Sequence, residues 1–134
     1  MIKLALLAKL NERSQAIKGS RILVPGIAYK KNVDDMRESP SLRLIELIEH
    51  RGGTVEFHDP HIPIIPPTRE HAALAGRRSQ PLEPKAIAAY DAVLISTDHD
   101  AVDWGLLVKN AKLVVDTRNA CARRGLPSEN VVKA

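Results

Sequence analysis

The sequence of residues 21–40 is RILVPGIAYKKNVDDMRESP, and this stretch joins two elements of different kinds. The apolar run at 21–25 is rich in β-branched residues, which predicts a buried strand. Ser39 can cap a helix and Pro40 suits its first turn, so a helix is expected from there onward. The connection between them is long for its kind. Long connections at the carboxyl ends of parallel strands are where open α/β sheets bind ligands.

This connection carries several basic side chains. Lys30, Lys31 and Arg37 precede the predicted helix N-terminus, whose free N–H groups favour anions. The pattern predicts an anion site, with phosphate as the expected group, but it does not identify the anion. The alternative is that Lys30 and Arg37 are solvated loop charges, with Arg37 paired to Asp34 or Asp35.

Strands and helices alternate along the rest of the chain. We expect strands at 54–58, 91–96 and 113–116, and helices at 2–16, 40–51, 84–90 and 102–110. This alternation predicts an α/β fold, a three-layer Rossmann-like parallel sheet with helices on both faces. The proline-rich residues 61–69 are expected to form an extended surface loop, and residues 127–134 a frayed tail.

The composition argues against several classes of function. The net charge is +4 and only 3% of residues are aromatic, so the chain lacks the stacking platforms of proteins that bind single-stranded nucleic acid. No apolar run approaches the ~20 residues that span a bilayer. Cys121 is the only cysteine, which rules out an internal disulfide and fits a reducing, cytoplasmic location. We therefore expect no nucleic-acid partner and no membrane partner.

Arg118 directly follows the predicted strand at 113–116. In a parallel sheet it should lie at the same edge as residues 26–37. Its planar guanidinium suits bidentate recognition of a phosphate or a carboxylate. The alternative is a salt bridge to Asp116.

Other polar residues receive structural interpretations. Asp98 or Asp100 is expected to cap the next helix rather than to act in catalysis. His58 and His61 could form half of a metal site, but the sequence offers no further ligand cluster beside them, so no metal is expected. Cys121 has no histidine close behind it, and we expect a packing or surface thiol rather than a nucleophile.

Several short motifs occur together in this chain. They are Gly26-Ile27-Ala28-Tyr29-Lys30, Asp35-Met36-Arg37-Glu38-Ser39-Pro40, His58-Asp59-Pro60, Thr97-Asp98-His99 and Val114-Val115-Asp116-Thr117-Arg118-Asn119. In residue type, order and spacing the set resembles the C-terminal domain of the UDP-glucose/GDP-mannose dehydrogenase family. The resemblance runs from about Lys18 to Ala120, which is most of the chain.

The resemblance implies roles for particular residues. Tyr29 and Lys30 match positions that hold the UDP part of the nucleotide sugar, and Arg118 matches an arginine that contacts the UDP-sugar. Arg37 matches a residue that reaches the phosphates of NAD across a domain interface. The motifs look more like the UDP-N-acetylhexosamine branch of the family than the UDP-glucose branch.

The resemblance also implies a reaction for the whole enzyme. Such enzymes oxidise the C6 hydroxyl of the sugar to a carboxylate for polysaccharide biosynthesis. They do so in two hydride transfers to NAD, through a thioester on a cysteine. The present sequence has neither a G-x-G-x-x-G fingerprint nor the family's cysteine segment. We therefore assign no catalytic residue and expect the isolated chain to be inactive.

A domain organisation follows from the same resemblance. Residues 1–18 are expected to be a linker helix from a preceding domain that is missing here, and residues 19–134 the UDP-binding C-terminal domain. The expected partners are a UDP-sugar and either the NAD-binding half of the enzyme or a second copy of the chain, bound through the N-terminal helix. The alternative is a free-standing nucleotide-binding or assembly module without catalysis.

Overall fold

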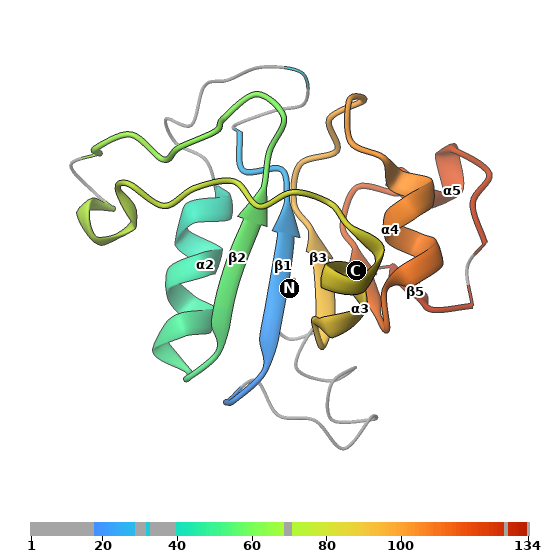
Figure 1. The fold of residues 1–134 in the computed structure, drawn as a ribbon, viewed down its shortest axis with the longest axis horizontal. Coiled ribbons are helices and arrows are strands. Elements are labelled where there is room, and N and C mark those ends of the chain that lie inside the picture. Colours follow the sequence, from blue (N-terminus) through green and yellow to red (C-terminus); the bar gives the residue numbers. More distant parts are fainter. Residues whose placement is uncertain (1–17, 29–31, 33–39, 69–70, 128, 134) are drawn as a thin grey trace.

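A computed structural model describes residues 18–28, 32, 40–68, 71–127 and 129–133. Its centre is a sheet of five parallel strands in the order β2-β1-β3-β4-β5 (Figure 1). The strands are β1 (Arg21–Pro25), β2 (Thr54–His58), β3 (Ala92–Ile95), β4 (Val114–Asp116) and β5 (Val131–Lys133). The chain therefore reverses its direction across the sheet between β1 and β3, and ligands of open α/β sheets bind beside such a reversal.

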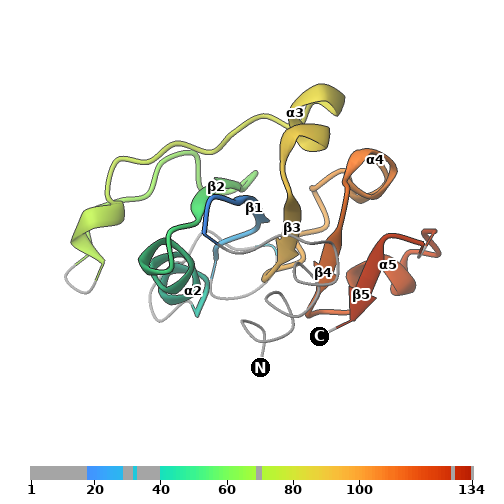
Figure 2. The same cartoon turned by 90° about the horizontal axis from the view of Figure 1, so that it is seen from below.

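Helices cover both faces of this sheet (Figure 2). They are α2 (Pro40–His50) on one face, and α3 (Pro84–Ala89), α4 (Trp104–Asn110) and α5 (Ala120–Arg123) on the other. Successive side chains of a strand point to opposite faces. Ile22 and Val24 thus pack in the core that contains α2, whereas Leu23 packs in the core that contains α3 and α4. The expected three-layer α/β fold is confirmed.

The N-terminal helix expected over residues 2–16 lies outside the described residues. Among the helices that the structure does describe, none has the length and apolar character to cross a membrane.

The helix α4 begins later than expected and has a different N-cap. It starts at Trp104, and the Asp103 side chain accepts a hydrogen bond from the backbone N–H of Leu106 at 3.1 Å. The prediction that Asp98 or Asp100 caps this helix was wrong. Both carboxylates are instead paired with arginine side chains that follow β4.

The expectation of a frayed tail was also wrong for residues 130–133. Residues Val131–Lys133 form β5, which pairs with β4 in parallel register, Val131 opposite Val114. Just before this strand, the Asn130 side-chain amide donates to the carbonyl oxygens of Val108 at 2.9 Å and Ala111 at 2.7 Å. These bonds join the end of α4 to the last strand, so the segment has partners on two elements.

The segment from 61 to 80 is more tightly packed than a surface loop. Ile62 and Ile65 are buried in the α2 core, and the backbone N–H of Ile65 donates to the Arg77 carbonyl at 2.9 Å. A short 3₁₀ helix, η1 (Ala72–Leu74), lies between Ile65 and Arg77 in sequence. The predicted extended loop is therefore correct for the prolines but wrong for the two isoleucines.

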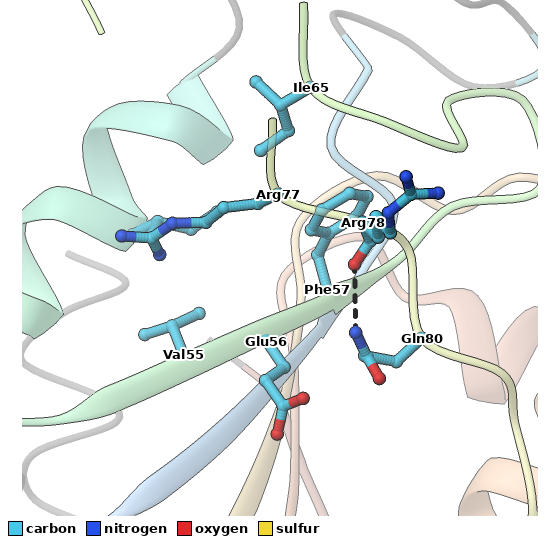
Figure 3. A pocket seen from close by; sticks show the side chains of 8 residues that line it. Val55, Glu56, Phe57, Ile65, Arg77, Arg78 and Gln80 are labelled. Carbon is cyan, nitrogen blue, oxygen red and sulfur yellow. Dashed lines mark hydrogen bonds between the residues drawn. The ribbon is translucent and has the colours of Figure 1, made fainter. Parts of the chain in front are cut away.

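A cavity of about 300 Å³ lies between this segment, α2 and β2 (Figure 3). Its lining comprises Ile45, Val55, Glu56, Phe57, Ile65, Arg77, Arg78 and Gln80. The Arg77 side chain reaches α2 and forms two hydrogen bonds with the Glu49 carboxylate, at 2.7 and 3.0 Å. The cavity is thus lined by α2, β2 and the segment that follows β2, and none of the residues predicted for the site is among its described lining residues.

Candidate functional site

The candidate site is the edge of the sheet at which β1, β2, β3 and β4 end. Figure 1 shows the ends of β1 and β2 at this edge. Because the strands are parallel, their carboxyl ends all meet there. Hydrogen bonds join the segments that follow them. The backbone N–H of Gly26 donates to the His58 carbonyl at 2.7 Å, and the Thr97 hydroxyl donates to the Ala28 carbonyl, also at 2.7 Å. This edge, which we call the rim, is therefore one connected structure.

Gly26 allows the chain to turn from β1 into the rim. Its φ is +89°, in the region that favours glycine. A Cβ placed on it would lie 2.1 Å from the Thr97 carbonyl oxygen. The turn after β1 is therefore packed directly against the backbone that follows β3.

Two buried polar side chains form the centre of the rim. The Nε2 atom of His99 lies 2.9 Å from Oδ2 of Asp59, and both side chains are fully buried. The same Oδ2 accepts a hydrogen bond from the backbone N–H of Ile27 at 2.8 Å. Oδ1 accepts from the backbone N–H groups of His61 at 2.8 Å and Ile62 at 3.1 Å. One carboxylate thus joins the segments that follow β1, β2 and β3.

The hydrogen bonds of His99 fix its tautomer. Its Nδ1 lies 2.7 Å from the backbone nitrogen of Asn32, which can only donate. Nδ1 must therefore accept, and Nε2 carries the proton that is donated to Asp59. The imidazole ring of His99 is neutral in this arrangement.

The surroundings of Asp59 act on its pKa in opposite directions. Burial alone would raise the pKa, but the hydrogen bonds from His99 and from the backbone N–H groups of Ile27 and His61 outweigh it. The pKa therefore lies below its ordinary value of 3.8.

This lowered pKa predicts how the fold responds to acid. A carboxylate with a lower pKa in the folded state stabilises that state above its unfolded pKa, and the contribution is lost as the pH falls through the folded pKa. We expect the free energy of unfolding to decrease as the pH falls below 3.8, with a smaller decrease in Asp59→Asn. Urea denaturation from about pH 5 to about pH 3 measures both. Equal slopes for the two proteins would contradict the prediction.

Among the described residues of the rim, Arg118 is a cation that remains available for a ligand. Its Nε donates to the Ser96 carbonyl at 2.8 Å, and its backbone N–H donates to Asp116 Oδ1 at 3.0 Å. The residue is exposed, and within the described part of the chain its two terminal nitrogens have no hydrogen-bond partner. Among these residues the alternative salt bridge to Asp116 is not formed. That carboxylate instead accepts from the backbone N–H groups that begin α5, at Ala120 and Cys121.

Two neighbouring arginines are already paired. Arg123 contacts Asp98, and Arg124 contacts both Asp98 at 3.7 Å and Asp100 at 2.9 Å. The Arg124 guanidinium also lies over the Trp104 ring, 5.3 Å from its centroid. These contacts neutralise the two cations, which distinguishes them from Arg118.

The described residues offer neither a metal centre nor an activated thiol. No group of three His, Cys, Asp or Glu side chains among them could hold a metal ion. His58 Nδ1 is bound to the Gln80 carbonyl at 2.7 Å, and the His61 ring packs edge-on against His99. Burial and the nearby Asp116 carboxylate raise the pKa of Cys121 to about 12, so this buried thiol is not a nucleophile at neutral pH.

The three other residues predicted for the site, Tyr29, Lys30 and Arg37, lie outside the described residues. The sequence argument overlooked the buried pair Asp59 and His99 and its contact with Asn32. A signal for the pair was present, because Asp59 directly follows one predicted strand and His99 comes three residues after another. Nothing in the sequence indicated that they touch.

Comparison with known proteins identifies this architecture. Residues 23–123 match the profile of the UDP-glucose/GDP-mannose dehydrogenase family, UDP binding domain. The chain belongs to this family. The matched region includes the whole rim, from the end of β1 to α5, and the family resemblance of the motifs is thereby confirmed.

Relatives within the family are named for different nucleotide sugars. A UDP-N-acetyl-D-mannosamine dehydrogenase from Pyrococcus horikoshii is 32% identical over 103 residues, which are 73% of this chain and 21% of that protein. A UDP-glucose 6-dehydrogenase from Rhizobium meliloti is 33% identical over 108 residues, 77% of this chain and 24% of that protein. The solved structure of the P. horikoshii UDP-D-ManNAc dehydrogenase superposes with a TM-score of 0.73 at 26% identity, covering 98% of this chain and 29% of that one. The chain thus spans about a quarter of the length of these relatives.

Proposed function

We propose that this chain is the UDP-sugar-binding C-terminal domain of an NAD-dependent nucleotide-sugar 6-dehydrogenase. The observation that carries the proposal is the exposed guanidinium of Arg118 at the rim. It stands at the carboxyl ends of the strands, in a domain whose family profile is described as UDP binding. The relatives named for UDP-sugars support the substrate class. A UDP-N-acetylhexosamine is the preferred substrate in this proposal, ahead of UDP-glucose.

In this proposal the diphosphate lies along the rim. The two terminal nitrogens of Arg118 donate hydrogen bonds to phosphate oxygens, because a planar guanidinium suits bidentate binding of a phosphate. The Ser96 carbonyl accepts from Nε and so holds the guanidinium in place. Lys30 supplies a second, point-like charge to the diphosphate. Tyr29 contacts the nucleotide by packing or by a hydrogen bond. The side chains proposed to bind the diphosphate therefore come from the segments after β1 and β4.

NAD is not proposed to bind at the described part of the rim. A dinucleotide site needs a glycine turn that lets the pyrophosphate approach the backbone, but the space at Gly26 is occupied by the Thr97 carbonyl oxygen. In the proposal, NAD is held mainly by another part of the enzyme, and Arg37 reaches its phosphates from this chain. Residues 1–18 are proposed as the helix that leads to that part, and 19–134 as the UDP-sugar domain.

Titration of the chain with UDP tests the proposal. Hydrogen bonds to charged groups contribute roughly 1.5–3 kcal/mol each, so Lys30→Ala and Arg118→Ala should each weaken UDP binding about tenfold or more. Arg37→Ala should leave UDP affinity nearly unchanged, because its expected partner is NAD. Isothermal calorimetry on the wild type and the three variants measures these changes.

Arg43→Ala is the matched control, because Arg43 is exposed on α2. It should bind UDP as the wild type does. Two results would refute the assignment of roles. One is an equal loss in Arg37→Ala and Lys30→Ala, and the other is a wild type that binds inorganic phosphate as well as it binds UDP.

A further inference from the structure

The connection that follows β1 is held at two points, and the first lies directly after the strand. The backbone N–H of Ile27 donates to Asp59 Oδ2 at 2.8 Å. One residue later, the Ala28 carbonyl accepts from the Thr97 hydroxyl at 2.7 Å. Asp59 and Thr97 are both buried, so water does not compete for these hydrogen bonds.

The second point is Asn32. Its backbone N–H donates to His99 Nδ1 at 2.7 Å. Its side chain forms two more bonds with Asp100, since Nδ2 donates to the carboxylate at 2.8 Å and Oδ1 accepts from the backbone N–H at 2.9 Å. Asn32 has a φ of 63°, a left-handed conformation that asparagine tolerates better than most residues.

Both points depend on one carboxylate oxygen. Oδ2 of Asp59 accepts from Ile27 and also from His99 Nε2 at 2.9 Å, and the other nitrogen of the same imidazole binds Asn32. Only residues 29–31 separate the two held points in sequence, and Tyr29 and Lys30 are among them.

We infer that Asp59 and His99 are positioning residues, which hold Ile27 and Asn32 on either side of Tyr29 and Lys30 in sequence and so support the binding of the diphosphate of a nucleotide sugar. The inference rests on the function proposed above. Neither residue needs to touch the ligand, because both are fully buried. The neutral, Nε2-protonated ring is required, since one nitrogen must accept while the other donates.

Substitution of His99 separates positioning from packing. His99→Phe keeps a ring but removes both hydrogen bonds, and we expect UDP binding to weaken about tenfold, as for the loss of one charged contact. His99→Gln retains one donor and one acceptor, and it should recover part of the affinity. Calorimetry with UDP measures both variants, alongside Arg43→Ala as a surface control.

A double-mutant cycle supplies the readout that a general loss of stability would not give. If His99 acts through the segment that holds Lys30, the effects of His99→Phe and Lys30→Ala on UDP affinity should be strongly non-additive. Arg118 is held instead by the Ser96 carbonyl, so His99→Phe and Arg118→Ala should be additive. Additivity in both cycles, or wild-type affinity in His99→Phe, would overturn the inference.

Two further measurements keep the test decisive. If His99→Phe does not fold, Asp100→Ala removes an exposed carboxylate that binds the Asn32 side chain and Arg124, and it leaves the buried pair Asp59 and His99 in place. It should show the same pattern of coupling with a smaller loss, and additivity with Lys30→Ala would then overturn the inference.

If the wild type does not bind UDP, the proposed function fails, and hydrogen exchange at the Asn32 amide still tests the two-point attachment. We expect protection that is lost in His99→Phe and regained in His99→Gln. Exchange that is unchanged in His99→Phe would overturn the inference, whatever the chain binds.

Discussion

Replacing Asp59 with alanine is expected to lower the free energy of unfolding by roughly 4 kcal/mol or more, because several buried donors lose the one carboxylate that they share. The carboxylate accepts hydrogen bonds from His99 Nε2 and from the backbone N–H groups of Ile27, His61 and Ile62. Alanine leaves these donors without an acceptor in a buried environment, and each unsatisfied group costs about 1–3 kcal/mol. Urea denaturation at neutral pH measures the loss.

Asp91→Ala is the matched control for this substitution. Asp91 also follows a structured element and accepts one backbone N–H, that of Arg21 at 2.8 Å, but the contact is exposed. Water can replace the lost acceptor there, so we expect a cost of about 1 kcal/mol or less. Similar losses for the two variants would show that the donors around Asp59 are rehydrated, and that the buried pair is not a centre of stability.

The parts of the fold that the sequence predicted are those with strong local patterns. The apolar strand before Gly26, the helix that Gly52 terminates and the buried strand Ala92–Ile95 all formed close to the expected positions. Their alternation was sufficient to predict a parallel sheet, and the sheet in turn placed Arg118 at the rim. The role of Arg118 in binding remains a prediction.

The parts that were wrong depend on partners distant in sequence. Val131 and Val132 form too short an apolar pair to indicate a strand, and they form one because β4 has a free edge beside them. Aspartate is a common helix cap, but the carboxylates of Asp98 and Asp100 are paired with Arg123 and Arg124 instead. The capping preference of a residue type is a weak predictor where a residue of opposite charge on another element lies within contact distance.

The contact between Asp59 and His99 shows the same limit within the site. The two residues are 40 positions apart, and no periodicity or spacing rule connects them. Each follows a different strand, so only the strand order brings them together. The sequence alone can show that polar residues follow the ends of several strands. Only the structure shows which of these residues are buried partners.

The second large effect is expected at Gly26, where Gly26→Ala should cost more than about 4 kcal/mol or prevent folding. Two penalties combine at this position. The φ of +89° disfavours any side chain, which costs roughly 1–2 kcal/mol. In addition, the new Cβ would lie 2.1 Å from the Thr97 carbonyl oxygen and 2.9 Å from its carbonyl carbon. Because these are backbone atoms, β1 and β3 would have to separate at the rim.

Gly76→Ala measures the backbone penalty without the close contact. Gly76 has nearly the same φ, +87°, but a Cβ there would meet no atom within 4 Å. Its substitution should therefore cost only the roughly 1–2 kcal/mol of the backbone conformation. The difference between the two variants in thermal or urea denaturation measures the close approach of the turn to Thr97. If Gly26→Ala is no less stable than Gly76→Ala, the segments after β1 and β3 are not in rigid contact. The Thr97 hydroxyl could then not hold Ala28 in a fixed place, and the attachment of the connection after β1 would rest on Asn32 alone.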